Sequence, residues 1–257
     1  MSNILTESVI ETQHWTDKLF SLKLTRSPGF RFESGQFAMV GLEVDGRPLM
    51  RAYSVASATY DDHVELLSIK VPNGPLTSRL QHVRPGDRIL VGRKATGTLL
   101  LGNLLPGRRL YLLSTGTGLA PFLSIIRDPA VYERFERVIL THTCRTADEL
   151  VYQDLILRDL PADEFLGEDV RAKLTYYQSV TREPFKNQGR ITDLVRSGKL
   201  FQDVDAPPFD PAEDRVMVCG NPSMMTEMSD YLAGLGFEMG NNAKPGHYVI
   251  EKAFAER

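Results

Sequence analysis

Apolar and polar residues alternate in short runs through the first hundred residues of the chain. Between positions 19 and 24 the apolar side chains stand at 20, 22 and 24, the period of two that is typical of a β-strand with one buried face. Similar runs follow at residues 36–42, 63–71 and 88–91, separated by turns rich in glycine and proline, and one short helix fits at 76–82. Short strands at this spacing predict an antiparallel β-barrel or sandwich.

The pattern changes after residue 102, where strand-like runs alternate with longer helical stretches. Strands are expected at 109–114, 137–143, 172–179 and 215–219, and helices at 120–127, 147–160, 191–197 and 222–235. Such alternation predicts a parallel α/β sheet with helices on both faces. We therefore expect two domains, an antiparallel barrel over residues 1–102 and an α/β nucleotide-binding domain over residues 103–257.

The composition is typical of a globular protein, since 42% of the 257 residues are hydrophobic and 25% are charged. Residues 1–102 carry 12 basic and 10 acidic side chains, and residues 103–257 carry 18 and 23, so neither part is basic enough to predict binding to nucleic acid. No apolar run approaches the roughly 18 residues of a membrane-spanning helix, and the first residues do not resemble a secretion signal. We expect a cytoplasmic protein without membrane insertion.

The cysteines and histidines do not form a metal-binding pattern. Cys144 and Cys219 stand far apart, and the five histidines lack the close spacing of a zinc site. We expect two reduced thiols and no metal.

Residues 111–122 indicate a buried strand that leads through a glycine turn into a helix. Gly116 and Gly118 allow a ligand to approach the backbone closely, and Pro121 suits a first helical turn. Free N–H groups at such a turn can bind a phosphate. Because Pro121 occupies the place of the third glycine in the dinucleotide fingerprint, an ordinary tight turn remains the alternative.

Three other motifs have chemistry that suits a nucleotide. In Arg51-Ala52-Tyr53-Ser54 the arginine can clamp a phosphate and the tyrosine can stack on a heterocycle, although an edge strand is the alternative. After Gly74, Thr77 or Ser78 can cap a helix that faces a pyrophosphate, or simply cap an ordinary helix. Cys219-Gly220 ends the last expected strand, at the edge of the sheet where doubly wound folds bind ligands. The alternative is that Cys219 is a buried, unreactive cysteine, which is the more common role of such a residue.

Taken together and in this order, these four motifs resemble the ferredoxin–NADP⁺ reductase superfamily, and specifically the bacterial ferredoxin/flavodoxin reductases. The resemblance covers essentially the whole chain. It implies that the barrel holds FAD and that the α/β domain holds NADP(H).

The resemblance also implies roles for individual residues. Tyr53 would stack on the isoalloxazine, Arg51 would pair with the FAD pyrophosphate, and Ser54 would lie near flavin N5. Ser54, Thr117 and Cys219 would border the place where the nicotinamide meets the flavin, and we expect them to be the catalytic residues. The full set expected at FAD is Arg51, Ala52, Tyr53, Ser54, Ile69, Lys70, Val71, Gly74, Leu76, Thr77, Thr117, Ala253 and Phe254. The set expected at NADPH is Gly116, Gly118, Arg145, Arg182, Arg190, Cys219 and Gly220.

The choice of NADPH over NADH also has a physical argument. An acidic residue at the end of the second strand binds the ribose 2′-hydroxyl in NAD-specific sites, whereas a 2′-phosphate requires cations. Here that strand ends at Cys144-Arg145 without an acid, and Arg182 and Arg190 follow later. Both match positions that bind the 2′-phosphate in the bacterial reductases.

The implied function is that of an FAD-dependent oxidoreductase, which passes a hydride between NADPH and FAD and single electrons between FAD and ferredoxin or flavodoxin. We expect a monomer. One alternative is a reductase that serves an oxygenase, free flavin or a ferric chelate. Another is a flavin-binding electron-transfer or redox-sensing subunit that does not oxidise NADPH.

Two surface features could affect partner and cofactor contacts. The last residues extend beyond the aromatic end of some relatives, so Ala253 or Phe254 is expected to approach the flavin or its adenine, with a frayed end as the alternative. Arg84, Arg88, Arg93 and Lys94 can form a basic face for an acidic carrier, or be scattered solvated charges.

Overall fold

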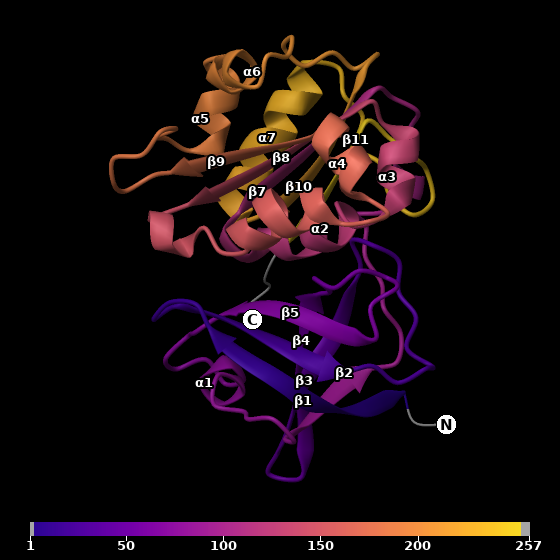
Figure 1. Ribbon diagram of the computed structural model, residues 1–257, viewed down its shortest axis with the longest axis vertical. Helices are drawn as coiled ribbons and strands as arrows, with labels where there is room; N and C mark the ends of the chain where they lie inside the picture. Colours follow the sequence, from indigo (N-terminus) through magenta and orange to yellow (C-terminus); the bar gives the residue numbers. More distant parts are fainter. Residues whose placement is uncertain (1–2, 253–257) are drawn as a thin grey trace.

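The computed structural model describes residues 3–252, and Figure 1 shows them as two stacked layers, each built on one β-sheet. The lower sheet is antiparallel, with strand order β4-β3-β6-β1-β2-β5. Its strands are β1 (Ile4–His14), β2 (Leu19–Thr25), β3 (Phe37–Val44), β4 (Arg47–Ser54), β5 (His63–Ile69) and β6 (Arg88–Gly92). An antiparallel bridge between Val55, just after β4, and Leu66 of β5 joins the two outer strands and curls the sheet into a barrel.

Strand β2 is buried on both faces, although its alternation predicted only one. Phe20, Leu22 and Leu24 fill the barrel, as the period of two requires. Leu19 instead packs in a core shared with the second sheet, because the second domain covers that face of β2.

The short helix of the first domain, α1 (Thr77–Leu80), is shorter than the expected 76–82. The prediction that Thr77 or Ser78 caps it is wrong. Leu76 occupies the N-cap position without a side-chain hydrogen bond, because the Thr77 hydroxyl donates to the Val71 carbonyl instead, at 3.4 Å.

The upper sheet is fully parallel, with strand order β11-β10-β7-β8-β9, as the α/β pattern predicted. Its strands are β7 (Arg109–Thr115), β8 (Arg137–Cys144), β9 (Leu174–Val180), β10 (Asp214–Gly220) and β11 (Tyr248–Lys252). Leu110 and Leu112 of β7 point into one core, whereas Tyr111 and Leu113 point into the other. Both faces of the sheet are therefore buried.

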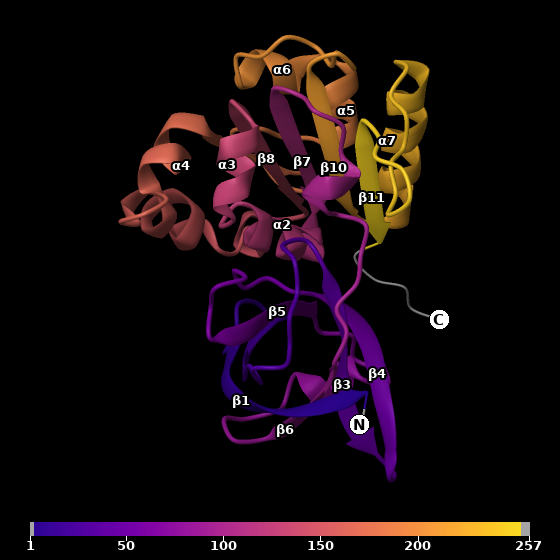
Figure 2. The same cartoon turned by 90° about the vertical axis from the view of Figure 1, so that its right-hand side faces the viewer.

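Helices cover both faces, as Figure 2 shows. The first face carries α2 (Ala120–Ile125), α3 (Pro129–Arg134) and α4 (Gly167–Lys173), and the second carries α5 (Ile191–Arg196), α6 (Lys199–Asp203) and α7 (Pro222–Gly234). Pro121 lies in the first turn of α2, as predicted. The sequence patterns missed β1 and β11 as separate strands, as well as α3, α4 and α6. Strand β4 was expected only as the edge-strand alternative for Arg51–Ser54, and it does lie at the edge of the strand order.

The single helix expected at 147–160 is wrong. The structure has a 3₁₀ turn at Ala147–Glu149, a π-helical turn at Leu155–Asp159 and another 3₁₀ turn at Leu160–Ala162. Tyr152 breaks the helix, because its φ of 64° is left-handed. This conformation is accompanied by contacts with the first domain: the Tyr152 hydroxyl donates to Glu65 at 2.8 Å, and its ring centroid lies 4.9 Å from that of Trp15.

The two layers are joined by buried contacts. Arg127, after α2, donates to the Ala56 carbonyl and pairs with Asp61 at 3.2 Å. The predicted boundary at 102/103 falls in a 3₁₀ turn, Leu101–Asn103, and stays a prediction. Within residues 3–252, no helix is both long and apolar enough to cross a membrane, and no three potential metal ligands cluster.

Candidate functional site

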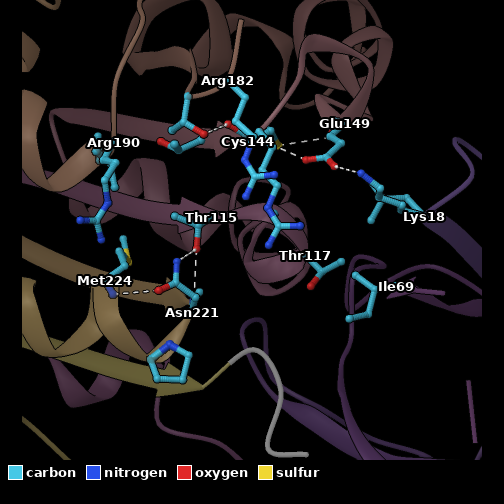
Figure 3. A pocket seen from close by; sticks show the side chains of 18 of the residues that line it. Lys18, Ile69, Thr115, Thr117, Cys144, Glu149, Arg182, Arg190, Asn221 and Met224 are labelled. Carbon is cyan, nitrogen blue, oxygen red and sulfur yellow. Dashed lines mark hydrogen bonds and ion pairs between the residues drawn. The ribbon is translucent and has the colours of Figure 1, made fainter. Parts of the chain in front are cut away.

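A cavity of about 720 Å³ opens at the carboxyl ends of β7, β8, β9 and β10, where the parallel sheet meets the barrel. Figure 3 shows its lining, to which the barrel contributes Lys18 and Ile69. Eight of the residues expected at a cofactor line it: Ile69, Lys70, Gly116, Thr117, Arg145, Arg182, Arg190 and Gly220. Ligands bind at this edge in open α/β sheets because the topology leaves a crevice there.

The glycine turn after β7 forms one wall of the cavity. Gly116 has a φ of 53°, and no protein atom lies within 4 Å of the point where a Cβ would stand. Gly118 is required for a different reason, since its Cβ would lie 2.2 Å from the carbonyl oxygen of Cys219. The turn is thus open towards the cavity and packed tightly against the end of β10.

A second glycine, Gly220 at the end of β10, is needed where that strand end packs against the end of β7. A Cβ on Gly220 would lie 2.1 Å from Oγ1 of Thr115. That hydroxyl accepts the backbone N–H of Asn221 at 3.1 Å, and the Asn221 side chain caps α7 by accepting from the N–H of Met224 at 3.0 Å. The start of α7 is therefore held at the cavity wall.

Three arginines that line the cavity come from different loops of the α/β domain. Arg145 follows β8, Arg182 follows β9, and Arg190 directly precedes α5. The Arg190 guanidinium lies 2.7 Å from the carboxylate of Glu227, whereas Arg145 and Arg182 form no ion pair within residues 3–252. Two unneutralised guanidinium groups beside a glycine turn fit an anionic nucleotide.

Thr117 lies where sequence reasoning placed it, between the two domains. Its turn packs against β5, and Figure 3 shows Thr117 beside Ile69. The side chain is largely covered, with 8% of its surface exposed.

The Arg51–Ser54 motif forms the end of β4, outside the cavity described above. Tyr53 is 2% exposed and packs in the barrel core, while Arg51 and Ser54 are half-buried. Arg51 donates to the Met50 carbonyl at 2.9 Å, and Ala52 is exposed. Stacking of Tyr53 on a flavin stays a prediction.

The second segment expected at FAD is a compact turn after β5. The N–H of Gly74 donates to the Val71 carbonyl at 3.0 Å, and a Cβ on Gly74 would lie 2.5 Å from the Thr77 hydroxyl. Leu76 is buried below the turn, and Lys70 donates to the Thr16 carbonyl at 2.6 Å. Ala253 and Phe254 lie outside the described residues.

Cys219 is fully buried, and its side chain is not part of the cavity lining. Burial raises the pKa of its thiol, so the group is neutral at physiological pH. The Cys219 carbonyl, rather than its sulfur, makes the close approach to Gly118. A role of Cys219 at the nicotinamide stays a prediction.

Glu251 is a residue that sequence reasoning missed. Its Oε1 accepts hydrogen bonds from the N–H and the hydroxyl of Thr98 at 2.9 and 3.3 Å, while its buried Oε2 has no partner within residues 3–252. Burial raises the pKa of this carboxyl to about 7, against the Thr98 hydrogen bonds, which lower it. A single glutamate near the end of the chain carried no sequence signal for this environment.

Glu251 contacts the segment of the barrel that neighbours the strand pair β3–β4. A Cβ on Gly97 would lie 3.1 Å from Oε1 of Glu251. The preceding residue, Thr96, forms an isolated β-bridge with Phe37 of β3, and Phe37 in turn pairs with Ser54 of β4. The buried Glu251 carboxyl is therefore connected, through Thr96 and Phe37, to the strand pair that carries Ser54.

Comparison with known proteins matches both halves of the chain. The oxidoreductase FAD-binding domain model covers residues 7–96, and the oxidoreductase NAD-binding domain model covers residues 112–230. Ferredoxin–NADP reductases from Pseudomonas aeruginosa and Azotobacter vinelandii are 59% and 58% identical over 258 residues, covering 100% of this chain and of each relative.

A solved structure of a ferredoxin–NADP⁺ reductase from Neisseria gonorrhoeae, with bound FAD and NADP, is also similar. It is 30% identical, with a TM-score of 0.89 and coverage of 99% of this chain and 100% of that one. With two domain models matched in order and full-length relatives at this identity, the chain belongs to the ferredoxin–NADP reductase family.

Proposed function

We propose that this protein is an FAD-dependent oxidoreductase that exchanges a hydride with NADPH and single electrons with ferredoxin or flavodoxin. The observation that carries the proposal is the cavity at the sheet edge, which is lined by an open glycine turn and by Arg145 and Arg182, neither of which forms an ion pair within residues 3–252. The names of the full-length relatives and the FAD-binding domain model support the same activity.

In this proposal the α/β domain, residues 103–257, binds NADPH. Arg145, Arg182 and Arg190 bind the 2′-phosphate, because guanidinium groups form charge-assisted hydrogen bonds to phosphate oxygens. The Gly116-to-Gly118 turn allows the dinucleotide to approach the backbone, since no Cβ projects from Gly116 into the cavity.

Residues 1–102 bind FAD, which supplies the hydride and one-electron chemistry when bound. Arg51 pairs with its pyrophosphate, Tyr53 contacts the ring system, and the segments at 69–71 and 74–77 complete the site. Ser54, from the barrel, and Thr117, from the α/β domain, would position the flavin and the nicotinamide against each other. An error of about an ångström in such positioning can cost about a hundredfold in rate.

Anaerobic mixing of the purified yellow holoprotein with NADPH tests the first half of the proposal. We expect the visible flavin absorbance to bleach, with NADPH much more effective than NADH. Absence of bleaching would reject the reductase and favour an electron-transfer or sensing subunit.

Acceptor kinetics test the second half. We expect ferredoxin and flavodoxin to accept electrons at rates that fall with added salt, because docking of an acidic carrier on basic residues is screened. Arg84 precedes β6, Arg88 begins it, and Arg93 and Lys94 follow it, so the four span the strand rather than one point. Efficient reduction of free flavin or ferric chelates alone would favour the alternative reductase. Light scattering of the purified protein checks the expected monomer.

A further inference from the structure

His142 occupies a buried position directly behind the glycine turn. It lies in β8, and its side chain is completely covered. Its Nε2 atom lies 3.2 Å from the carbonyl oxygen of Gly116 and 3.2 Å from Sγ of Cys144, and its Nδ1 lies 3.1 Å from the hydroxyl of Tyr176. One imidazole therefore contacts the ends of two strands and the body of a third.

The partners define which nitrogen of His142 carries the proton. Burial lowers the pKa of His142 to about 4, so the ring is neutral and has one donor and one acceptor. A carbonyl can only accept, so Nε2–H donates to Gly116 and Nδ1 accepts from the Tyr176 hydroxyl. The Cys144 thiol, kept protonated because burial raises its pKa, donates to the Glu149 carbonyl at 3.3 Å.

The residues held by this ring are those that face the cavity. The open Gly116 belongs to the turn that borders the cavity, and Cys144 lines it directly before Arg145. Gly116 has no side chain, and its φ is left-handed, so only contacts of its backbone can fix the turn. The hydrogen bond from His142 supplies an anchor from behind.

We propose that His142, oriented by Tyr176, is a positioning residue for the pyridine nucleotide, which holds the Gly116 turn and the Cys144–Arg145 strand end at their binding distance. This inference rests on the proposed binding of NADPH in the cavity. His142 itself does not line the cavity, so it acts through the groups that it anchors.

Three variants of the holoprotein separate anchoring from packing. His142→Leu removes the donor at similar volume, His142→Gln retains a side-chain amide that can donate to Gly116, and Tyr176→Phe removes only the hydroxyl that orients the ring. Tyr111→Phe is the matched control, because Tyr111 is a buried phenol in the core on the other face of the sheet.

The readout is the Kd for NADP⁺ from calorimetric titration, together with FAD content, melting temperature, and KM and kcat for NADPH. Loss of one buried hydrogen bond predicts a Kd about five- to thirtyfold higher for His142→Leu, and about two- to fivefold higher for Tyr176→Phe. KM should rise more than kcat falls. His142→Gln should lie within about threefold of the wild type, and Tyr111→Phe should bind like it.

Three results would overturn the inference: wild-type affinity in a folded His142→Leu protein, equal affinity losses in the Leu and Gln variants, or equal affinities for Tyr176→Phe and Tyr111→Phe. If His142→Leu does not fold, the affinities of Tyr176→Phe and Tyr111→Phe for NADP⁺ test the inference instead. A wild-type protein that does not bind NADP⁺ at all would instead reject the proposed function.

Discussion

At the residue scale, Glu251 couples the stability of the protein to pH. Its carboxyl has a pKa of about 7 in the folded chain, above its ordinary value of 4.5, because it is buried. Between these two pH values the folded state keeps a proton that the unfolded state loses, so stability falls as pH rises through this window. Above pH 7 the buried charge of Glu251 lowers the free energy of unfolding by at most about 3 kcal/mol.

Glu251→Gln should therefore raise the melting temperature at pH 8.5 by several degrees, and by much less at pH 5. Glutamine can still accept from Thr98, so the hydrogen bond is retained. Thermal unfolding with excess FAD at both pH values is the measurement. Glu238→Gln, at an exposed position, is the control and should follow the wild type. An equal shift at both pH values would contradict the role of the Glu251 charge.

The unpaired arginines predict a difference between the two nucleotides. Arg182→Ala should raise KM for NADPH by about 10- to 100-fold, the value of a lost charge-assisted hydrogen bond to phosphate, and change KM for NADH little. Steady-state kinetics with both nucleotides are the measurement. Arg158→Ala, at an exposed arginine on the π-helical turn, is the control. An equal loss for NADPH and NADH would show that Arg182 does not contact the 2′-phosphate.

At the scale of elements, the contact between the Gly116–Leu119 turn and the end of β10 permits no side chain. Gly118→Ala should displace the turn, because the new Cβ would meet the Cys219 backbone at 2.2 Å. We expect a loss of about 1–3 kcal/mol in stability, the usual cost of overpacking, and a Kd for NADP⁺ at least tenfold higher. Melting curves and calorimetric titration measure the two effects.

The matched control is Gly234→Ala, at the end of α7, where no atom lies within 4 Å of the new Cβ. It should leave both quantities unchanged or raise stability slightly, because alanine favours helix. Similar behaviour of the two variants would mean that the turn has room to relax.

At the scale of the whole molecule, Arg127 links the domains. Its guanidinium is nearly buried and binds the Ala56 carbonyl and Asp61 of the barrel. Arg127→Met removes a buried donor from the Ala56 carbonyl and a charged partner from Asp61, which keeps its hydrogen bond from the Ala58 N–H, so we expect about 2–4 kcal/mol of destabilisation. Calorimetry of the holoprotein should show a lower melting temperature and a transition that broadens or divides into two.

Arg158→Met removes two exposed ion pairs, with Asp154 and Asp159, and should leave the melting curve unchanged. If Arg127→Met melts like Arg158→Met, other contacts between the domains, such as the shared core around Leu19, would be sufficient to couple them.

The sequence by itself determined the two fold classes, the family and the sheet edge at which the cavity opens. Periods of two and 3.6 residues depend only on local geometry. Gly118 and Gly220 stand where a Cβ would collide with neighbouring atoms, and Gly116 has a left-handed φ, so these constraints are visible in the residue type. The family resemblance is confirmed because it rests on four such local motifs in a fixed order.

Only the tertiary structure decided the features that depend on contacts between distant segments. The expected helix at 147–160 is interrupted at Tyr152, whose φ is left-handed and whose hydroxyl binds Glu65 of the other domain. Glu251 acquires its unusual pKa from burial beside Thr98. His142 looks like an ordinary strand residue until Gly116 and Tyr176 are placed around it. The burial of a side chain and its hydrogen-bond partners depend on which distant segments pack against it. Local sequence patterns do not specify that packing for individual residues.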